Sequence, residues 1–243
     1  MNARLTAATA ARVLRQLRND RRTIGILLLL PSVLVGLIAW MFDGTPVLNT
    51  FGPLLVGLFP LIVMFIVTSV ATLRERQSGT LERLMTTPIG KADVVVGYAL
   101  AFGVVAIVQA LVLIGFALWV CGMEVAGDTW VVALVAVLDA ILGTALGLAA
   151  SAVARTEFQA VQLMPVVIFP QLITGGLLMP RDQMPAVLEA VSRGLPLTYG
   201  MDALQTLARG GGFVDVQGSV GVVVLFIVGA LALGATTLRR RTA

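Results

Sequence analysis

The order of hydrophobic and polar residues divides the chain into long apolar runs separated by short charged segments. A helix rises about 1.5 Å per residue, so roughly 20 apolar residues are needed to cross the hydrocarbon core of a membrane. We expect a transmembrane helix in each of six runs, at 24–42, 50–73, 94–120, 130–154, 160–179 and 217–238. No run shows the polar and apolar alternation of a membrane barrel strand. The pattern therefore predicts an all-α, polytopic membrane protein in which residues 1–243 form a single transmembrane domain.

Residues 1–22 precede the first run and carry their own helical pattern. Small and apolar side chains recur there at spacings of three and four residues: Ala3, Ala7, Ala10, Leu14 and Leu17. A separate basic stripe consists of Arg15, Arg18 and Arg22. This arrangement is typical of an amphipathic helix lying at the membrane interface, with a plain basic anchor for the first span as the alternative. A signal peptide is disfavoured, because the apolar run is long and residues 40–43 offer no small-residue cleavage site.

Residues 181–214 are too long for a tight connection between the fifth and sixth spans. One apolar helical face is formed by Val187, Leu188, Val191 and Leu195. A second short helix is predicted from Thr198, with Met201, Leu204 and Leu207 on one face and the glycines at 210–212 as its end. We expect both short helices on the extracellular side, half-immersed in the outer leaflet or packed on the extracellular mouth.

Composition and charge agree with a membrane protein and restrict its orientation. Hydrophobic residues make up 58% of the chain and charged residues 12%, with a mean hydropathy of +0.97, which excludes an ordinary soluble domain. Fourteen of the 17 Lys and Arg residues lie before the first span, after the second and fourth spans, or in the C-terminal tail. By the positive-inside rule we expect both termini on the cytoplasmic side of the membrane. This distribution also explains the basic pI without a nucleic-acid partner.

The loop at 74–93 carries the most informative local pattern. Thr80 suits a helix N-cap, Glu82 suits the positive end of the helix dipole, and Pro88 marks the stop. Three apolar side chains then share one face of this short helix: Leu81, Leu84 and Met85. The charged residues expected around this apolar knob are Glu75, Arg76, Glu82 and Arg83. The pattern predicts a cytoplasmic helix that docks into a groove of a soluble partner, the alternative being a local cap under the bundle.

Two stretches of the chain resemble the ABC type-2 permease family of drug, antibiotic, polysaccharide and lipid exporters. The first is 75–88, with charged residues followed by Gly-Thr-Leu-Glu, an aliphatic pair and Thr-Pro. The second is 180–211, in which the residues in family-like order are Pro185, Pro196, Tyr199, Asp202, Ala203 and Leu204. The resemblance extends over the whole chain. It implies the permease subunit of an ATP-driven exporter of an amphiphilic or hydrophobic drug, antibiotic or lipid-like substrate.

The resemblance also implies roles for particular segments. Residues 75–88 would be the coupling helix that receives motion from a cytoplasmic ATPase, and two permease halves, identical or related, would form one transporter with the second and fifth spans lining the exit path. The residues assigned to ATPase coupling are Glu75, Gly79, Thr80, Leu81, Glu82, Leu84, Met85 and Pro88. Membrane lipid is the remaining expected partner.

The chain itself shows no sign of an enzyme. It has no P-loop, because its only lysine, Lys91, is followed by Ala92, so we expect Mg-ATP and its hydrolysis on a separate ATP-binding-cassette subunit and no cofactor or metal on this chain. It has no histidine, which removes Ser-His and His-metal chemistry, and Cys121 is its only cysteine.

Residues of two predicted spans suggest a translocation path. Pro165 and Pro170 interrupt the fifth span, and the backbone groups that proline frees are tolerated in a membrane only where protein or a cavity covers them. We hypothesise an apolar path lined by Phe59, Met64, Gln171 and Thr174. Simple packing between helices is the alternative.

Asp139 is the only charged residue inside the fourth predicted span, roughly 13 Å below its start. A charge at that depth is expensive, so we expect a hydrogen-bonded, protonated or hydrated side chain. The alternatives are a structural hydrogen bond within the bundle, a place on the substrate or dimer path, and proton coupling. The last alternative would make the protein a secondary transporter that uses Asp139.

Overall fold

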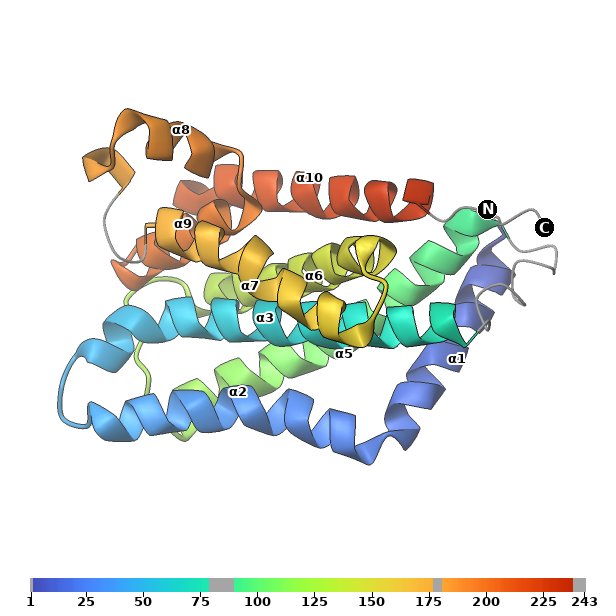
Figure 1. Cartoon of the computed structure of the whole chain (residues 1–243). Coiled ribbons are helices and arrows are strands. Elements are labelled where there is room, and N and C mark those ends of the chain that lie inside the picture. Colours follow the sequence, from blue (N-terminus) through green and yellow to red (C-terminus); the bar gives the residue numbers. More distant parts are fainter. Residues whose placement is uncertain (1, 79–89, 177–180, 238–243) are drawn as a thin grey trace.

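The computed structural model of the chain describes residues 2–78, 90–176 and 181–237, and these residues form a bundle of helices (Figure 1). No strand occurs among them, which confirms the all-α prediction for this part of the chain. The helices are α1 (Ala3–Asn19), α2 (Arg21–Met41), α3 (Val47–Gln77), α5 (Lys91–Trp119), α6 (Thr129–Val153), α7 (Glu157–Thr174), the 3₁₀-helix η1 (Arg181–Gln183), α8 (Ala186–Arg193), α9 (Pro196–Ala208) and α10 (Phe213–Thr237).

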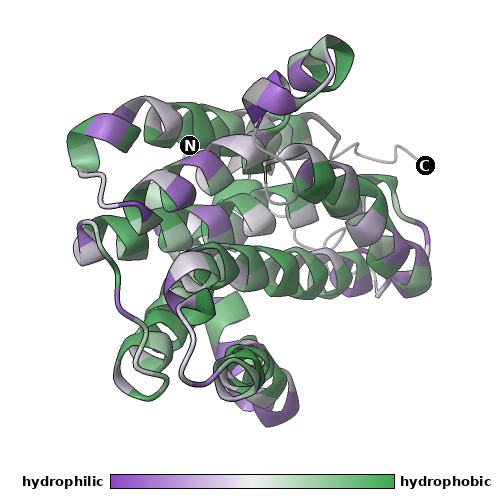
Figure 2. Ribbon diagram, turned by 90° about the vertical axis from the view of Figure 1, so that its left-hand side faces the viewer, coloured by the Kyte–Doolittle hydropathy of each residue, from purple (hydrophilic) through white to green (hydrophobic). Residues whose placement is uncertain are grey.

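Five of the described helices are long and apolar enough to cross a membrane: α2, α3, α5, α6 and α10. They make this a multi-pass membrane protein. In Figure 2 hydrophobic colouring predominates on the helical ribbons of the bundle. The fifth predicted span, 160–179, is the one missing from these five; it falls on α7, which has 18 residues with two internal prolines. Three glutamines also lower its hydropathy, and part of the predicted run lies at 177–180, outside the described residues. A count of six spans therefore stays a prediction.

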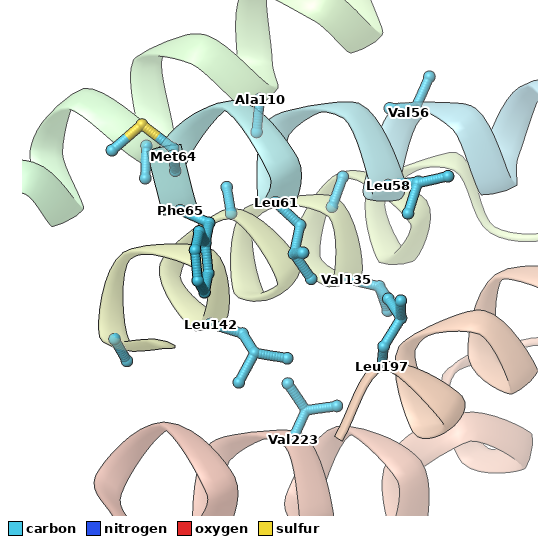
Figure 3. Packing of buried hydrophobic residues seen from close by; sticks show 14 of the residues in the cluster. Val56, Leu58, Leu61, Met64, Phe65, Ala110, Val135, Leu142, Leu197 and Val223 are labelled. Atoms are coloured by element: carbon cyan, nitrogen blue, oxygen red, sulfur yellow. The ribbon is translucent and has the colours of Figure 1, made fainter. Parts of the chain in front are cut away.

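The centre of the bundle is a close pairing of α3 with α6. A Cβ atom on Gly143 of α6 would lie 2.2 Å from the carbonyl oxygen of Leu61 on α3, and one on Gly147 would lie 2.6 Å from that of Phe65. Glycines four residues apart allow two helix backbones to approach this closely in a membrane. Leu61 and Phe65 then reach the same buried cluster as Leu142, as Figure 3 shows.

The predicted N-terminal helix exists as α1, but its buried face is shifted. The buried residues of α1 are Thr6, Thr9, Ala10 and Val13. Ala3 and Ala7, which the sequence places on the apolar face, are exposed. Threonine can be buried here because its hydroxyl finds a partner within the helix, and that of Thr9 donates to the carbonyl of Leu5 at 3.0 Å. The buried face is thus shifted toward Thr6 and Thr9, but it still includes Ala10, with Leu14 and Leu17 half-buried against the core. Arg15, Arg18 and Arg22 are exposed as a basic stripe requires, and the placement of α1 at the membrane interface stays a prediction.

The two short helices between α7 and α10 differ strongly in burial. Met201, Leu204 and Leu207 of α9 are completely buried against the bundle. The helix begins at Pro196, two residues earlier than predicted, because proline fits the first helical position. On α8 the apolar face is exposed, with Val187 at 74% and Val191 at 51% of full exposure.

Figure 1 places α1 at the same end of the bundle as the C-terminal ends of α3 and α10 and the start of α5, with α8 near the other end. This grouping agrees with the prediction that both termini and the 74–93 loop lie on the same side of the membrane. In a Cys121→Ala background, a cysteine introduced by Arg15→Cys should resist an impermeant thiol reagent in intact cells, whereas one introduced by Ala190→Cys should react. Both positions are exposed. Labelling of the first cysteine without the second would reverse the orientation.

Candidate functional site

A buried ionic cluster joins α1, α3 and α5. The last two of these helices flank residues 79–89 in the sequence, because α3 ends at Gln77 and α5 begins at Lys91. Glu75, in the last turn of α3, is only 7% exposed and accepts hydrogen bonds from Arg12 of α1, at 2.9 Å between Nη2 and Oε2 and 3.5 Å between Nη1 and Oε1. The hydroxyl of Tyr98 on α5 donates to Oε2 of Glu75 and accepts from Nη2 of Arg12 at 2.9 Å. We call these three residues the clamp.

The clamp is held by strong interactions. A guanidinium that meets both oxygens of a carboxylate fixes its geometry as well as its distance. The guanidinium also lies 5.8 Å from the centre of the Tyr98 ring, within the range of a cation–π contact. Because a buried carboxylate is costly unless it is paired, loss of Arg12 would leave Glu75 uncompensated.

A second attachment holds the start of α1 to the start of α5. Asp93 is 4% exposed and accepts at Oδ1 from the backbone N–H of Asn2 at 2.8 Å and from the hydroxyl of Thr6 at 3.1 Å. Its other oxygen accepts from the backbone N–H of Gly90 at 3.1 Å. Between the two attachments α1 and α5 approach closely, since a Cβ on Gly97 would lie 2.8 Å from the side chain of Thr9.

The last turn of α3 is tied on its other side to α6 and α7. Arg74 binds Glu157 at the start of α7 through two contacts of 2.9 and 3.0 Å, which keeps the pKa of that carboxyl below its usual value. Arg76 donates to the carbonyl of Ser151 at 3.2 Å, and Gln77 donates to that of Arg155 at 2.8 Å. Several elements therefore hold the end of α3 at once.

These contacts correct one expectation and leave another open. The sequence places Glu75 and Arg76 around an exposed apolar knob, but Glu75 is buried in the clamp and Arg76 is half-buried against α6. The remaining residues predicted for ATPase coupling lie outside the described residues: Gly79, Thr80, Leu81, Glu82, Leu84, Met85 and Pro88. The coupling helix stays a prediction.

The four residues of the hypothesised path all lie on α3 and α7. Met64 is completely buried in the hydrophobic cluster, as Figure 3 shows, and Phe59 is half-buried. Gln171 accepts from the backbone N–H of Leu197 at 3.1 Å and so anchors the start of α9, and Thr174 donates to a carbonyl of its own helix. Within one chain these contacts favour helix packing, and the path stays a prediction.

Asp139 is completely buried where α6 meets α3 and α9. Cβ atoms on Gly57 and Gly200 would lie 2.8 and 2.3 Å from its carboxyl oxygens, so both glycines give this side chain its space. Among the described residues neither oxygen has a hydrogen-bond partner. The structural hydrogen bond expected for Asp139 is therefore absent within that part of the chain. The other two alternatives for Asp139, a place on the substrate or dimer path and proton coupling, stay predictions.

Sequence reasoning missed Arg12, Tyr98 and Asp93. The hydrogen bonds of Arg12 join residues 63 and 86 positions apart, and helical periodicity carries no information at such separations. The one available signal was Arg12 itself, which directly precedes the buried Val13 and so borders the buried face of α1.

The family model described as ABC-2 type transporter matches residues 4–208, which include the clamp, the 79–89 segment and α9. The chain belongs to the ABC-2 type transporter family. Within this family it is 24% identical over 181 residues to "Probable multidrug ABC transporter permease YbhS" of Escherichia coli (strain K12), an alignment of 74% of this chain and 48% of the relative.

Two other relatives extend the comparison. The chain is 27% identical over 169 residues to "Linearmycin resistance permease protein LnrN" of Bacillus subtilis (strain 168), covering 69% of this chain and 43% of the relative. It is 33% identical over 141 residues to "ABC transporter G family member 20" of Dictyostelium discoideum, covering 58% of this chain and 19% of the relative. The aligned region spans less than half the length of each of these three ABC-2 relatives.

Proposed function

We propose that this ABC-2 chain is the permease subunit of an ATP-driven exporter that moves an amphiphilic or hydrophobic drug, antibiotic or lipid-like substrate out across the bacterial cytoplasmic membrane. The observation that carries the proposal is the family match over both the clamp and the segment it encloses. The names of two relatives, a probable multidrug permease and a linearmycin resistance permease, support the substrate class. The family match also favours this function over secondary transport through Asp139.

The clamp suggests how a conformational change in a separate ATPase would be transmitted to the helices of such a permease. An ATP-binding subunit that holds Mg-ATP would dock on residues 79–89 and displace that segment. Because Glu75 and Asp93 tie both ends of the segment to α1, the displacement would reach α1 as well as α3 and α5. Only one residue, Asp20, separates α1 from α2, so movement of α1 is passed directly to a membrane-spanning helix.

The docking step is tested by truncating the predicted apolar knob. Burial of one aliphatic side chain is worth roughly 1.5 to 3 kcal/mol, so Leu84→Ala should weaken binding of the ATPase subunit by about tenfold or more. Glu82→Lys reverses a charge at the predicted helix start and should uncouple transport while the protein still inserts. The measurements are ATPase pull-down and substrate efflux.

A matched control for these variants is Val187→Ala, which truncates an exposed aliphatic side chain on α8, near the other end of the bundle. Its ATPase binding and efflux should equal those of the unmodified protein at the same membrane level. Unchanged binding and efflux in the Leu84→Ala, Glu82→Lys double variant would make this segment only a local cap.

We further propose that two permease chains, identical or related, assemble with two ATPase subunits. One chain would supply half of a lined path, and the outer faces of α2 and α10 expose apolar side chains such as Leu29 and Leu225, at 65% and 70%. Mass measurement of the complex in detergent should give two permease chains. An active complex with one permease chain would contradict the assembly.

A further inference from the structure

A cavity of about 260 Å³ lies at the elbow between α1 and α2 and faces α3 and α5. Figure 1 shows this elbow, with α3 running beside α2. The apolar walls include Val13, Leu17, Ile66, Val67, Val70 and Phe102. Ile26 of α2 also lines the cavity and is 62% exposed, on a helix whose neighbouring Leu29 and Leu30 are exposed too. The cavity therefore adjoins a face of α2 suited to contact with lipid.

The lining changes from apolar to charged along α3. The aliphatic side chains come from Ile66, Val67, Val70 and Ala71, and Arg74 and Glu75 follow on the same side of the helix. At 1.5 Å per residue this stretch is about 14 Å long. Arg74 is bound by Glu157, and Glu75 is bound by Arg12, so both charges are already compensated.

Asp20 also lies at the charged end of the cavity, but its interactions differ from those of Arg74 and Glu75. It is exposed, and its carboxylate accepts from Thr23, at 2.7 Å from the hydroxyl and 3.1 Å from the backbone N–H. It belongs to none of the salt bridges among the described residues. The Thr23 hydroxyl bond lowers the pKa of Asp20, so the group is anionic at neutral pH and open to a cation.

We propose that this cavity binds one acyl chain of a phospholipid whose head group carries an amine, such as phosphatidylethanolamine. The chain lies along Ile66, Val67 and Val70, and the ammonium group meets Asp20. The apolar walls disfavour water, and the volume is below the roughly 300–1,000 Å³ typical of pockets for drug-sized ligands, which suits a single chain.

Neighbouring charges limit which residue can distinguish one phospholipid head group from another. Arg21 and Arg22 directly follow Asp20 and are exposed, and they suit the phosphate that all phospholipids share. The preference for an amine therefore depends on Asp20. Glu75 and Tyr98 of the clamp also line the cavity, but binding of a lipid there requires no ATPase, so this site goes beyond the proposed export function and does not depend on it.

The test uses a tryptophan reporter in lipid nanodiscs with brominated acyl chains, which quench nearby tryptophan fluorescence. Trp40, Trp119 and Trp130 are first replaced by phenylalanine. The Phe102→Trp substitution then places a reporter in the cavity wall, at a position that is only 1% exposed. Two matched controls place the tryptophan where its surroundings are known. Leu100→Trp faces outward at 52% exposure, and Phe65→Trp is completely buried in the core.

With a bound chain, the Phe102→Trp reporter should be quenched as strongly as the Leu100→Trp control, and Ala71→Leu, which fills the cavity, should remove this quenching. Bromine on phosphatidylethanolamine should quench more than bromine on phosphatidylglycerol, and Asp20→Asn should abolish that difference. Quenching no greater than in the Phe65→Trp control would overturn the site. Equal quenching by the two lipids would overturn the amine assignment.

A second measurement applies if Phe102→Trp does not insert. Native mass spectrometry of the purified protein should detect retained phosphatidylethanolamine, and Ala71→Leu should lose one bound lipid relative to a protein that carries Leu100→Trp. Equal lipid retention in these two variants would also overturn the site.

Discussion

Gly143→Ala should prevent normal folding, although it adds only one methyl group. The new Cβ would lie 2.2 Å from the carbonyl oxygen of Leu61 and 2.9 Å from two further backbone atoms of that residue. No rotamer change can relieve a contact with backbone, so α3 and α6 would have to separate at the centre of the bundle. Overpacking of a core commonly costs 1 to 3 kcal/mol, and we expect at least about 3 kcal/mol at this position.

The matched control is Gly103→Ala on α5, where an added Cβ would have nothing within 4 Å. There the substitution should be neutral or stabilising by up to about 1 kcal/mol, because alanine is the better helix former. The measurement is thermal unfolding of the detergent-solubilised proteins, followed by size-exclusion chromatography. Equal melting temperatures for the two variants would contradict the close α3–α6 packing.

Arg12→Ala should abolish coupled transport while the ATPase subunit still binds. It leaves the carboxylate of Glu75, whose side chain is 8% exposed, without its cation, and removal of one partner of a buried pair commonly costs 3–5 kcal/mol. The lower end, about 3 kcal/mol, is expected because the Arg12 side chain is 34% exposed. The released α1 would no longer follow α3 and α5. Efflux and ATPase activity of the assembled transporter are the measurements.

A geometrically similar but exposed pair supplies the control. Arg74 and Glu157 also meet at 2.9 Å, but their side chains are 64% and 41% exposed, so Arg74→Ala should cost no more than about 1 kcal/mol and keep transport. Adding Glu75→Gln to Arg12→Ala should restore part of the stability, because it removes the uncompensated charge. If Arg12→Ala and Arg74→Ala behaved alike, the clamp would have no special role.

The helical class of this protein was predictable because long charge-free runs have few structural solutions in a membrane. The sequence was less decisive for α7, where glutamines and prolines reduce the hydropathy of a shorter helix. It was incomplete for α1, because the buried face contains Thr6 and Thr9 beside the predicted Ala10, and the two threonine hydroxyls find partners at Asp93 and within the helix. A hydropathy pattern ranks such residues as polar and cannot foresee their partners.

The candidate site was predictable only where it coincided with a local motif. The motif at 75–88 identified Glu75 as a candidate residue. The partners of Glu75, Arg12 and Tyr98, lie on other helices, and only the folded structure brings them into contact with it. Depth in the membrane identified Asp139 as unusual, yet the space around it comes from Gly57 and Gly200, which are distant in sequence. By contrast, the spacing of Gly143 and Gly147 was a readable signal of helix packing.

ATP-driven export through this permease can be measured by reconstitution. The permease and its ATPase subunit would be placed in inverted vesicles, and uptake of a fluorescent amphiphile would be followed with ATP and Mg²⁺, with a non-hydrolysable ATP analogue, and with an imposed proton gradient alone. We expect uptake only with hydrolysable ATP, and we expect the Arg12→Ala variant to lose this uptake. Uptake driven by the proton gradient without ATP, and abolished by Asp139→Asn, would contradict ATP-driven export.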